Sequence, residues 1–244
     1  MVHIMNIKLG FSTGAFYKHL SISEAIIFIK NAGCNAVELG FVKMNNIEEQ
    51  QLLEITAEDL NGFEFVSFHA PKINYGKNKE TEDVFEKIKR IDSIRKLDIV
   101  VFHPDSVEDF DIFDNLSFNI GFENMDNRSD LFKNPQDFKE LFSKNKGHKL
   151  IVDLNHIYAN DRSMKLAGDF YKELGDRINE IHLSGCLTGH QPLFETKQLE
   201  ILEAMRDFNT PIIIESILQP QDLIKEKNYI LDFTETKLSR KQKQ

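Results

Sequence analysis

The sequence reads INEIH at 178–182 and PIIIE at 211–215, and each of these largely apolar runs ends at a residue that can bind a metal ion. Four more runs have the same form: FVSFH at 65–69, IVVFH at 99–103, FNIGFE at 118–123 and LIVD at 150–153. A charged group at the end of a buried strand is costly unless something pairs with it. The repeated pattern therefore indicates one shared site, at the carboxyl ends of the strands of a parallel barrel.

Helix-like stretches separate the strand-like runs along the whole chain. Strands are predicted at 5–11, 35–39, 63–68, 98–102, 116–122, 149–152, 177–183 and 211–215. Helices are predicted at about 24–32, 47–61, 80–97, 136–144, 162–174 and 195–208, with a short acidic turn or helix over 106–115 and a last helix from about 219. Sustained alternation predicts parallel strands with right-handed crossovers, and continuous apolar strands are typical of sheets that are buried on both faces.

These elements predict the α/β fold class and, within it, a single-domain (β/α)8 TIM barrel over residues 1–230. Residues 231–244 are predicted to form a basic, flexible tail. The 244-residue length fits one barrel, which typically has about 250 residues. A doubly wound open sheet is the alternative, but such a sheet usually has fewer strands and rarely places polar residues at nearly every strand end.

The composition argues against several classes of protein. The net charge of −9 and the scarcity of Arg relative to Lys disfavour a mainly electrostatic nucleic-acid binder. No apolar run approaches the roughly 20 residues of a membrane span, and the first residues lack the pattern of a signal peptide. We therefore expect no membrane partner. Cys34 and Cys186 form no CxxC motif, so we expect reduced thiols and a cytoplasmic location.

Four strand-end residues are candidate ligands of one ion, because a barrel would bring them to the same opening. They are Glu123, Asp153, His182 and Glu215. Carboxylates combined with an imidazole fit a divalent ion such as Mn²⁺, Zn²⁺, Mg²⁺, Co²⁺ or Fe²⁺. We therefore expect one divalent ion as the cofactor. His69 and His103 are candidate ligands of a second ion, which would share Glu123 as a bridge.

Each of these residues taken alone also has a structural explanation. A single strand-end His is more often a hydrogen-bonded core residue, and a single strand-end carboxylate often caps a helix or pairs with Lys. Ser12 and Glu38 fit either a pocket or an ordinary structural role. Other catalytic schemes are weaker, since there is no GxSxG, GxxxxGK[ST] or GxGxxG motif and Cys186 has no base at a suitable spacing.

Short motifs follow one another at the strand ends: VELG at 37–40, FHAP at 68–71, FHP at 102–104, FEN at 122–124, DLNH at 153–156, EIHLSG at 180–185 with GHQPL at 189–193, and IIIES at 212–216. In this order and spacing they resemble the xylose isomerase-like TIM-barrel superfamily. That group contains the endonuclease IV-type enzymes of AP endonuclease family 2 and the sugar isomerases and epimerases. The resemblance covers essentially the whole chain and is specific to the superfamily, not to one activity.

The resemblance to the endonuclease branch implies up to three ions. The family quartet falls on the four residues named above, and a second ion falls on His69 and His103. A third ion would need the His of a DxxH segment and an Asp-x-His segment. His156 and His190 match the two histidines, but Thr188 stands in place of the Asp. The endonuclease branch also has an aromatic residue that enters the DNA, and at the corresponding position this sequence has Lys72.

The resemblance to the isomerase and epimerase branch implies different roles. Glu123 and Glu215 would be catalytic, one taking a proton from the substrate carbon and the other returning it, while the ion polarises the adjacent carbonyl. His69 and His103 would then bind hydroxyl groups. The predicted substrate-binding residues are His156, His190, Glu38 and Lys72.

The favoured function is therefore a divalent-metal-dependent sugar or sugar-phosphate isomerase or epimerase, with a small carbohydrate as the substrate. One alternative is an endonuclease IV-like zinc phosphodiesterase that acts on abasic DNA, and only then would DNA be a partner. The other alternative is a non-catalytic barrel that binds a metal ion or a metabolite.

Overall fold

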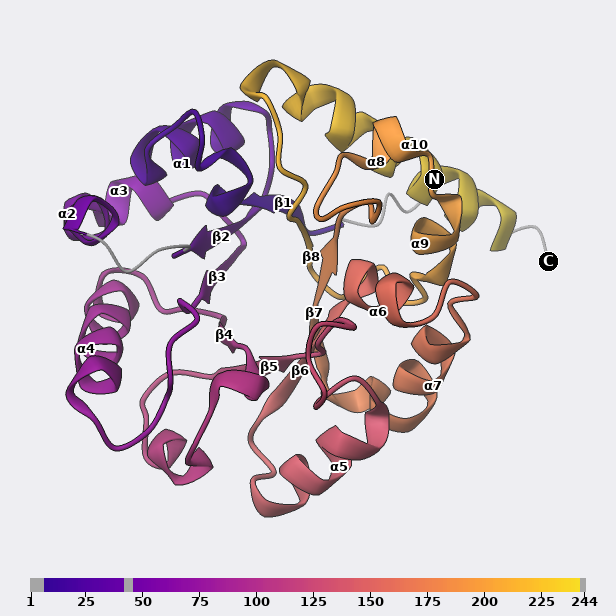
Figure 1. The fold of residues 1–244 in the computed structure, drawn as a ribbon. Helices are drawn as coiled ribbons and strands as arrows, with labels where there is room; N and C mark the ends of the chain where they lie inside the picture. Colours follow the sequence, from indigo (N-terminus) through magenta and orange to yellow (C-terminus); the bar gives the residue numbers. More distant parts are fainter. Residues whose placement is uncertain (1–6, 42–45, 242–244) are drawn as a thin grey trace.

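The computed structural model describes residues 7–41 and 46–241, without the side chains of 46–48, 240 and 241. Its strands are β1 (Leu9–Ser12), β2 (Ala36–Gly40), β3 (Phe65–His69), β4 (Ile99–Phe102), β5 (Ile120–Glu123), β6 (Lys149–Asp153), β7 (Ile178–Leu183) and β8 (Ile212–Ile214). All eight are parallel, each pairs with the next along the chain, and β8 pairs with β1 to close a barrel (Figure 1). The predicted single-domain (β/α)8 fold is confirmed.

Helices form an outer ring around the barrel (Figure 1). They are α1 (Ile22–Asn31), α2 (Asn46–Glu54), α3 (Ala57–Leu60), α4 (Lys79–Ile94), α5 (Pro135–Lys144), α6 (Leu154–Asn160), α7 (Lys165–Leu174), α8 (Leu193–Thr196), α9 (Leu199–Ala204) and α10 (Leu223–Lys241). Short 3-10 helices are η1 (Thr13–Phe16), η2 (Pro104–Ser106), η3 (Phe110–Phe113), η4 (Gly175–Arg177) and η5 (Pro220–Asp222). None of the helices in the described ranges is long and apolar enough to cross a membrane.

Two predicted helices are each divided in the structure. The stretch 47–61 forms α2 and α3, because Thr56 and Asp59 make a reciprocal capping box that starts a new helix. The stretch 195–208 forms α8 and α9, separated at Lys197, whose φ of 56° is not helical. The helix α6 was not predicted; it follows β6 directly, with Asp153 as its N-cap.

The connection from β4 to β5 contains η2 and η3 but no α-helix over its described residues 103–119. The ring of Phe113 takes the place of a helix against the outer wall. Its centroid lies 4.8 Å from that of Phe102 and 5.3 Å from that of Phe122, both in edge contacts. Aromatic packing of this kind buries apolar surface without a complete helical turn.

The interior of the barrel has an apolar lower half. Its cluster consists of Ala36, Phe65, Ile99, Val101, Ile151 and Ile213, all buried. Successive strand residues point to opposite faces, so the residue two positions further along each strand also points inward, but nearer the carboxyl end. On several strands that next inward residue is ionisable.

The C-terminal helix α10 includes residues 231–241, so the predicted boundary between barrel and tail falls inside this helix. Glu226 fixes its start, because its buried carboxylate accepts hydrogen bonds from the backbone N–H groups of Leu193 (2.8 Å) and Phe194 (2.9 Å) and from Ser216 Oγ (2.7 Å). Residues 242–244, and residues 5 and 6 of the first predicted strand, lie outside the described residues. Flexibility of the tail stays a prediction.

Candidate metal centre and active site

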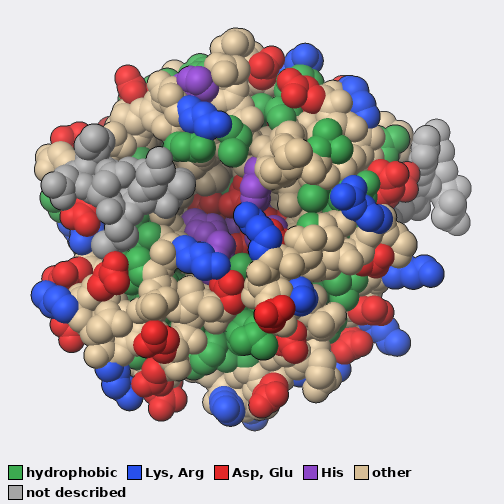
Figure 2. Space-filling view, in the orientation of Figure 1, with side chains coloured by type: hydrophobic (Ala, Val, Ile, Leu, Met, Phe, Trp, Pro, Cys, Tyr) green, Lys and Arg blue, Asp and Glu red, His purple; other side chains and the backbone are tan. Residues whose placement is uncertain are grey.

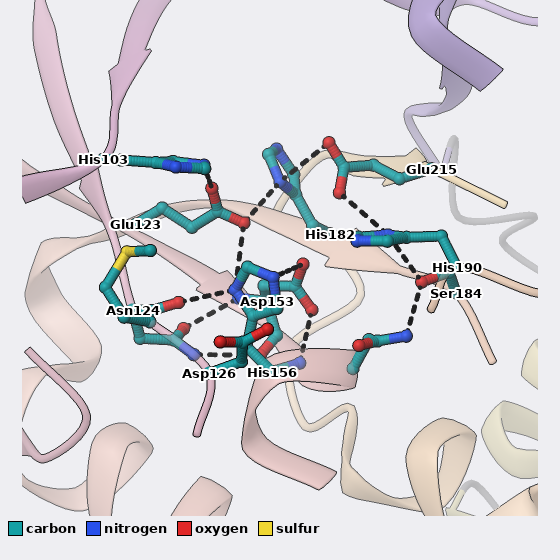
Figure 3. Close-up of polar contacts among 12 residues, drawn as sticks. His103, Glu123, Asn124, Asp126, Asp153, His156, His182, Ser184, His190 and Glu215 are labelled. Carbon is teal, nitrogen blue, oxygen red and sulfur yellow. Dashed lines mark hydrogen bonds and ion pairs between the residues drawn. The ribbon is translucent and has the colours of Figure 1, made fainter. Parts of the chain in front are cut away.

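The carboxyl-end opening of the barrel collects the four residues that the sequence predicted as ligands of one ion. One ligand atom from each of Glu123, Asp153, His182 and Glu215 lies within 4.8 Å of the others (Figure 3). Glu123 and Asp153 end β5 and β6, His182 belongs to β7, and Glu215 follows β8. They meet because parallel strands in a closed barrel all end at the same edge.

Glu123 is the centre of this cluster. Its Oε2 lies 2.9 Å from His103 Nε2 and 3.2 Å from His69 Nε2, and its Oε1 lies 3.2 Å from His182 Nδ1. Burial alone would raise the pKa of Glu123, but the charges of His156 and His182 and the hydrogen bonds from the imidazoles lower this pKa well below its ordinary value. Glu123 is therefore held as a carboxylate.

Asp153 leaves one carboxylate oxygen available to a cation. Its Oδ1 accepts the backbone N–H of His156 at 2.9 Å, whereas its Oδ2 is buried, makes no hydrogen bond among the described residues and lies 3.6 Å from His156 Nε2. Burial raises the pKa of Asp153 to about 6, although the charge of His156 acts in the opposite direction. An unsatisfied buried oxygen is costly, and coordination of a cation would satisfy it.

Glu215 differs from Glu123 because it is partly exposed, at 15% of its side-chain surface, and faces the cavity. Burial and the neighbouring carboxylate of Glu123 raise the pKa of Glu215 to about 8, against the effect of His182. The environments of the two glutamates thus push their pKa values in opposite directions. In many active sites such a division separates an acid from a base.

His69 faces Glu123 in a way that requires a positive charge between them. A carbonyl oxygen only accepts, so the contact of 3.1 Å between His69 Nδ1 and the Ala70 carbonyl assigns the proton to Nδ1. Its Nε2 would otherwise point a lone pair at the carboxylate. Burial alone would lower the pKa of His69, but Glu123 and Glu38 raise it to about 10. Either a second proton or a metal ion fits this position.

A cavity of about 260 Å³ opens above the cluster (Figure 2). The imidazoles in its wall are those of His69, His103, His156 and His190. The His156 Nδ1–H donates to the Asn124 carbonyl at 2.8 Å, and His190 Nδ1 lies 3.1 Å from Ser184 Oγ. The structure therefore brings the predicted substrate-binding histidines to the same cavity as Glu123 and Glu215.

Two other predicted substrate-binding residues lie in different places. Lys72 lines the mouth of the cavity, is 58% exposed and pairs with Asp105 at 2.9 Å. Glu38 is completely buried and is not part of the cavity wall; its Oε2 lies 3.3 Å from His182 Nε2. Glu38 is thus beneath the cluster rather than beside a substrate.

The third ion of the endonuclease branch has no carboxylate at its predicted position. Thr188 is exposed, and its hydroxyl accepts a hydrogen bond from the Gln191 side chain at 2.6 Å. Cys186 is buried, and burial raises its pKa, so it is a poor nucleophile.

Several residues of the site were not found from the sequence. Glu180 is fully buried next to His182, with a distance of 3.4 Å between Glu180 Oε1 and His182 Nε2. The two-residue period of a strand was a signal, because Glu180 and His182 must share a face. Asn124 Nδ2–H donates to the Asp153 carbonyl (3.1 Å), while Asn124 Oδ1 accepts from the Asp153 N–H (2.8 Å). Arg128 lines the mouth from a loop, where no pattern indicated it.

The fold and the site together define a class of protein: a (β/α)8 barrel with carboxylates and imidazoles gathered at its carboxyl-end opening. No family model and no curated protein matches the sequence. Solved structures do share the fold. A D-tagatose 3-epimerase-like protein is 17% identical with a TM-score of 0.70, and the match covers 96% of this chain and 99% of that one.

Two further solved structures are similar over nearly their full lengths. Endonuclease IV from Thermus thermophilus is 14% identical with a TM-score of 0.65, covering 94% of this chain and 99% of that one. The probable 3-DHS dehydratase AsbF from Bacillus anthracis is 16% identical with a TM-score of 0.63, covering 93% and 99%. The chain thus shares its (β/α)8 fold with these solved structures.

Proposed function

We propose that this protein is a divalent-metal-dependent isomerase or epimerase of a sugar or sugar phosphate. The observation that carries the proposal is the convergence of four donor atoms within 4.8 Å, two of them from Glu123 and Glu215, which line a cavity of about 260 Å³. This volume is slightly below the usual range of small-molecule pockets, which runs from about 300 to 1,000 Å³. A small polyhydroxylated substrate fits both the size and the imidazole-rich wall.

The residues present fit a divalent ion. Glu123, Asp153, His182 and Glu215 would hold it, and Oδ2 of Asp153 makes no hydrogen bond among the described residues that would compete with an ion. Oxygen donors with one imidazole favour Mn²⁺, Mg²⁺, Co²⁺ or Zn²⁺ over ions that prefer thiolates. When bound, such an ion polarises a carbonyl oxygen of the substrate.

Glu123 and Glu215 would move the proton. Glu123 ends β5, Glu215 follows β8, and His182 lies between them (Figure 3). One carboxylate would accept the proton from the carbon beside the carbonyl, and the other would return a proton to the product. His156 and His190 would bind substrate hydroxyl groups and hold the reacting carbon between the two carboxylates.

The mouth of the cavity supports an anionic substituent on the substrate. Lys72 and Arg128 both line it, and each is oriented by a carboxylate, Asp105 for Lys72 and Asp126 for Arg128. Two cations held above an acidic floor would favour a sugar phosphate with its phosphate at the rim. The structural similarity to a D-tagatose 3-epimerase-like protein supports the isomerase class.

The test is proton exchange. The protein is incubated in D₂O with Mn²⁺, Mg²⁺, Co²⁺ or Zn²⁺ and a panel of ketoses and ketose phosphates, and deuterium at the carbon beside the carbonyl is measured by NMR. We expect exchange with at least one sugar, and its loss in Glu123→Gln and Glu215→Gln. The matched control Glu200→Gln, on the exposed face of α9, should exchange normally. Absence of exchange with every sugar and ion contradicts the proposal.

One observation favours a second candidate, an endonuclease IV-like phosphodiesterase. His69 and His103 both reach Glu123 Oε2, and the three ligand atoms lie within 4.8 Å, which would allow a second ion. Paired ions stabilise the attacking and leaving oxygens in phosphodiester hydrolysis. Incision of a duplex with one abasic site, together with two or more zinc ions per chain, would favour this candidate and exclude the simple epimerase. Metal binding without exchange or incision would leave a non-catalytic binding barrel.

A further inference from the structure

A second layer of polar residues lies inside the barrel, beneath the proposed metal centre. It consists of Glu38 on β2, Ser67 on β3 and Glu180 on β7, all with no exposed surface. The strand register pairs Glu38 with Ser67, and Glu180 is two residues before His182 on the same inward face of β7. These residues do not line the cavity, so they are closed off from any substrate.

His182 connects this layer to the cluster above it. Its Nδ1 faces upward, 3.2 Å from Glu123 Oε1 and 3.5 Å from Glu215 Oε1. Its Nε2 faces downward, 3.3 Å from Glu38 Oε2 and 3.4 Å from Glu180 Oε1. A neutral imidazole has one nitrogen with a lone pair and one with a proton, so only one of these faces can bind an ion while the other donates.

We propose that Glu38 and Glu180 are positioning residues for His182. They accept the proton of Nε2–H from below. The proton that Nδ1 shares with Glu123 would be displaced when an ion binds, and the lone pair of Nδ1 would then be directed at that ion. The inference rests on the proposed metal centre. A metal-bound His commonly donates its other N–H to a carboxylate, which fixes the ring and strengthens it as a ligand, and loss of such a partner typically weakens metal binding about 10- to 100-fold.

Ser67 keeps one of these carboxylates in place. Its Oγ–H donates to Glu180 Oε1 at 2.9 Å, the same oxygen that lies near His182 Nε2. Glu38 approaches the same nitrogen from β2, nearly opposite β7 in the barrel. A carboxylate on two sides of Nε2 restricts rotation of the imidazole, which a single partner would leave freer.

The two buried carboxylates that hold the imidazole of His182 are expected to lower the stability of the fold. Glu38 Oε1 and Glu180 Oε2 are buried and have no hydrogen-bond partner among the described residues, and the 3.3 Å contact between Glu38 Oε2 and His182 Nε2 is an ion pair without hydrogen-bond alignment. Buried carboxylates without complete partners destabilise a fold, and neutral replacements of similar shape are often tolerated or stabilising. A positioning role therefore predicts opposite effects on metal binding and on stability, whereas a purely structural role predicts loss of both.

A deeper cation site is the competing explanation, because ligand atoms of Glu38, Glu180 and His182 also lie within 4.8 Å of one another. With the upper site also occupied, it would require the imidazole of His182 to bind ions through both nitrogens at once, and therefore to lose both protons. Three protein ligands in a chamber without an opening would also have to admit the ion through the barrel. The metal count of the variants separates this explanation from the proposal.

The experiment compares wild type with Glu38→Gln, Glu180→Gln and Glu180→Leu. Mn²⁺ or Co²⁺ affinity and stoichiometry are measured by calorimetry, and the stability of the metal-free protein by urea denaturation. The Co²⁺ form also gives a direct signal, since the paramagnetically shifted, exchangeable N–H proton of His182 can be followed by NMR. Ile151→Val is the matched control, because Ile151 pairs with Glu180 in the strand register.

We expect unchanged stoichiometry, metal affinity reduced about 10- to 100-fold in Glu180→Leu and less in the Gln variants, and faster exchange of the His182 proton. The urea midpoint should be unchanged or higher, and Ile151→Val should bind metal normally. Unchanged affinity, loss of one ion per chain, or a lower urea midpoint in the Gln variants would overturn the proposal, as would a wild type that binds no ion. A wild type that binds an ion but exchanges no sugar proton removes the proposed function and leaves this inference intact.

Discussion

The two halves of the barrel interior are built from the same strands but have opposite chemistry. An apolar inward residue of β4, β6 or β8 is followed two positions later, at or just past the strand end, by an ionisable one: Val101 by His103, Ile151 by Asp153, and Ile213 by Glu215. The lower half excludes water and contributes apolar burial. The upper half holds carboxylates and imidazoles that cost stability unless an ion or protons compensate them. Stability and chemistry are thus separated along each of these strands.

The largest effect on stability is expected in the lower half. Ile213→Ala removes a fully buried side chain between β7 and β1 and should destabilise the protein by about 2–5 kcal/mol in urea denaturation. Because Ile213 has no ligand atom, the folded variant should still bind a divalent ion with wild-type stoichiometry. A folded variant that no longer binds the ion would show that ion binding in the upper half depends on packing in the lower half.

A second expected effect is a pH dependence of stability to which His190, in the upper half, contributes. Burial and the charge of His156 lower the pKa of His190 to about 4, below its ordinary value near 6.5. Between these pH values the unfolded chain binds more protons than the folded one, so stability is lost as the pH falls from about 6.5 to 4.

In His190→Gln this loss should be smaller by roughly 1–3 kcal/mol, measured by urea denaturation of the metal-free protein at several pH values. Ile213→Ala is the control, and should lower stability at every pH without changing the slope. If stability depends on pH equally in wild type and in His190→Gln, His190 is not a source of the pH dependence.

The smallest expected effect is a gain in stability. Asp153→Asn keeps the oxygen that caps α6 through the N–H of His156 but removes a buried charge. The metal-free variant should be more stable than wild type by about 1 kcal/mol at pH 7, while its affinity for a divalent ion falls. Stability that decreases together with metal affinity would mean that Asp153 is mainly structural.

The sequence predicted the eight strands and the residues at their ends because apolar runs and a two-residue period are local signals. The sequence did not distinguish residues beneath the metal-ligand cluster from residues at the mouth of the cavity. Glu38 and Lys72 were both expected beside a substrate, yet one lies beneath the cluster and the other at the mouth. The depth of an inward residue depends on the stagger between strands, which is a property of the closed barrel and not of any one segment.

Other differences also arise from long-range contacts. Glu180 was read as part of a strand, and its burial beside Glu38 follows only from the closure of the sheet. The missing helix between β4 and β5 is replaced by packing of Phe113 on two strands, which no helical period reveals. By contrast, the capping box at Thr56 was visible in the sequence, but the helical pattern around it concealed the break.

The central claim is that Glu123, with its three partners, forms a divalent metal centre in the upper half of the barrel. The most direct measurement is the metal content of purified wild type, Glu123→Gln and the exposed control Glu200→Gln after equilibration with Mn²⁺ or Zn²⁺. The account predicts at least one ion per chain in wild type and in the control, and none retained by Glu123→Gln. Equal metal content in wild type and Glu123→Gln, or a wild type without any ion, would contradict it.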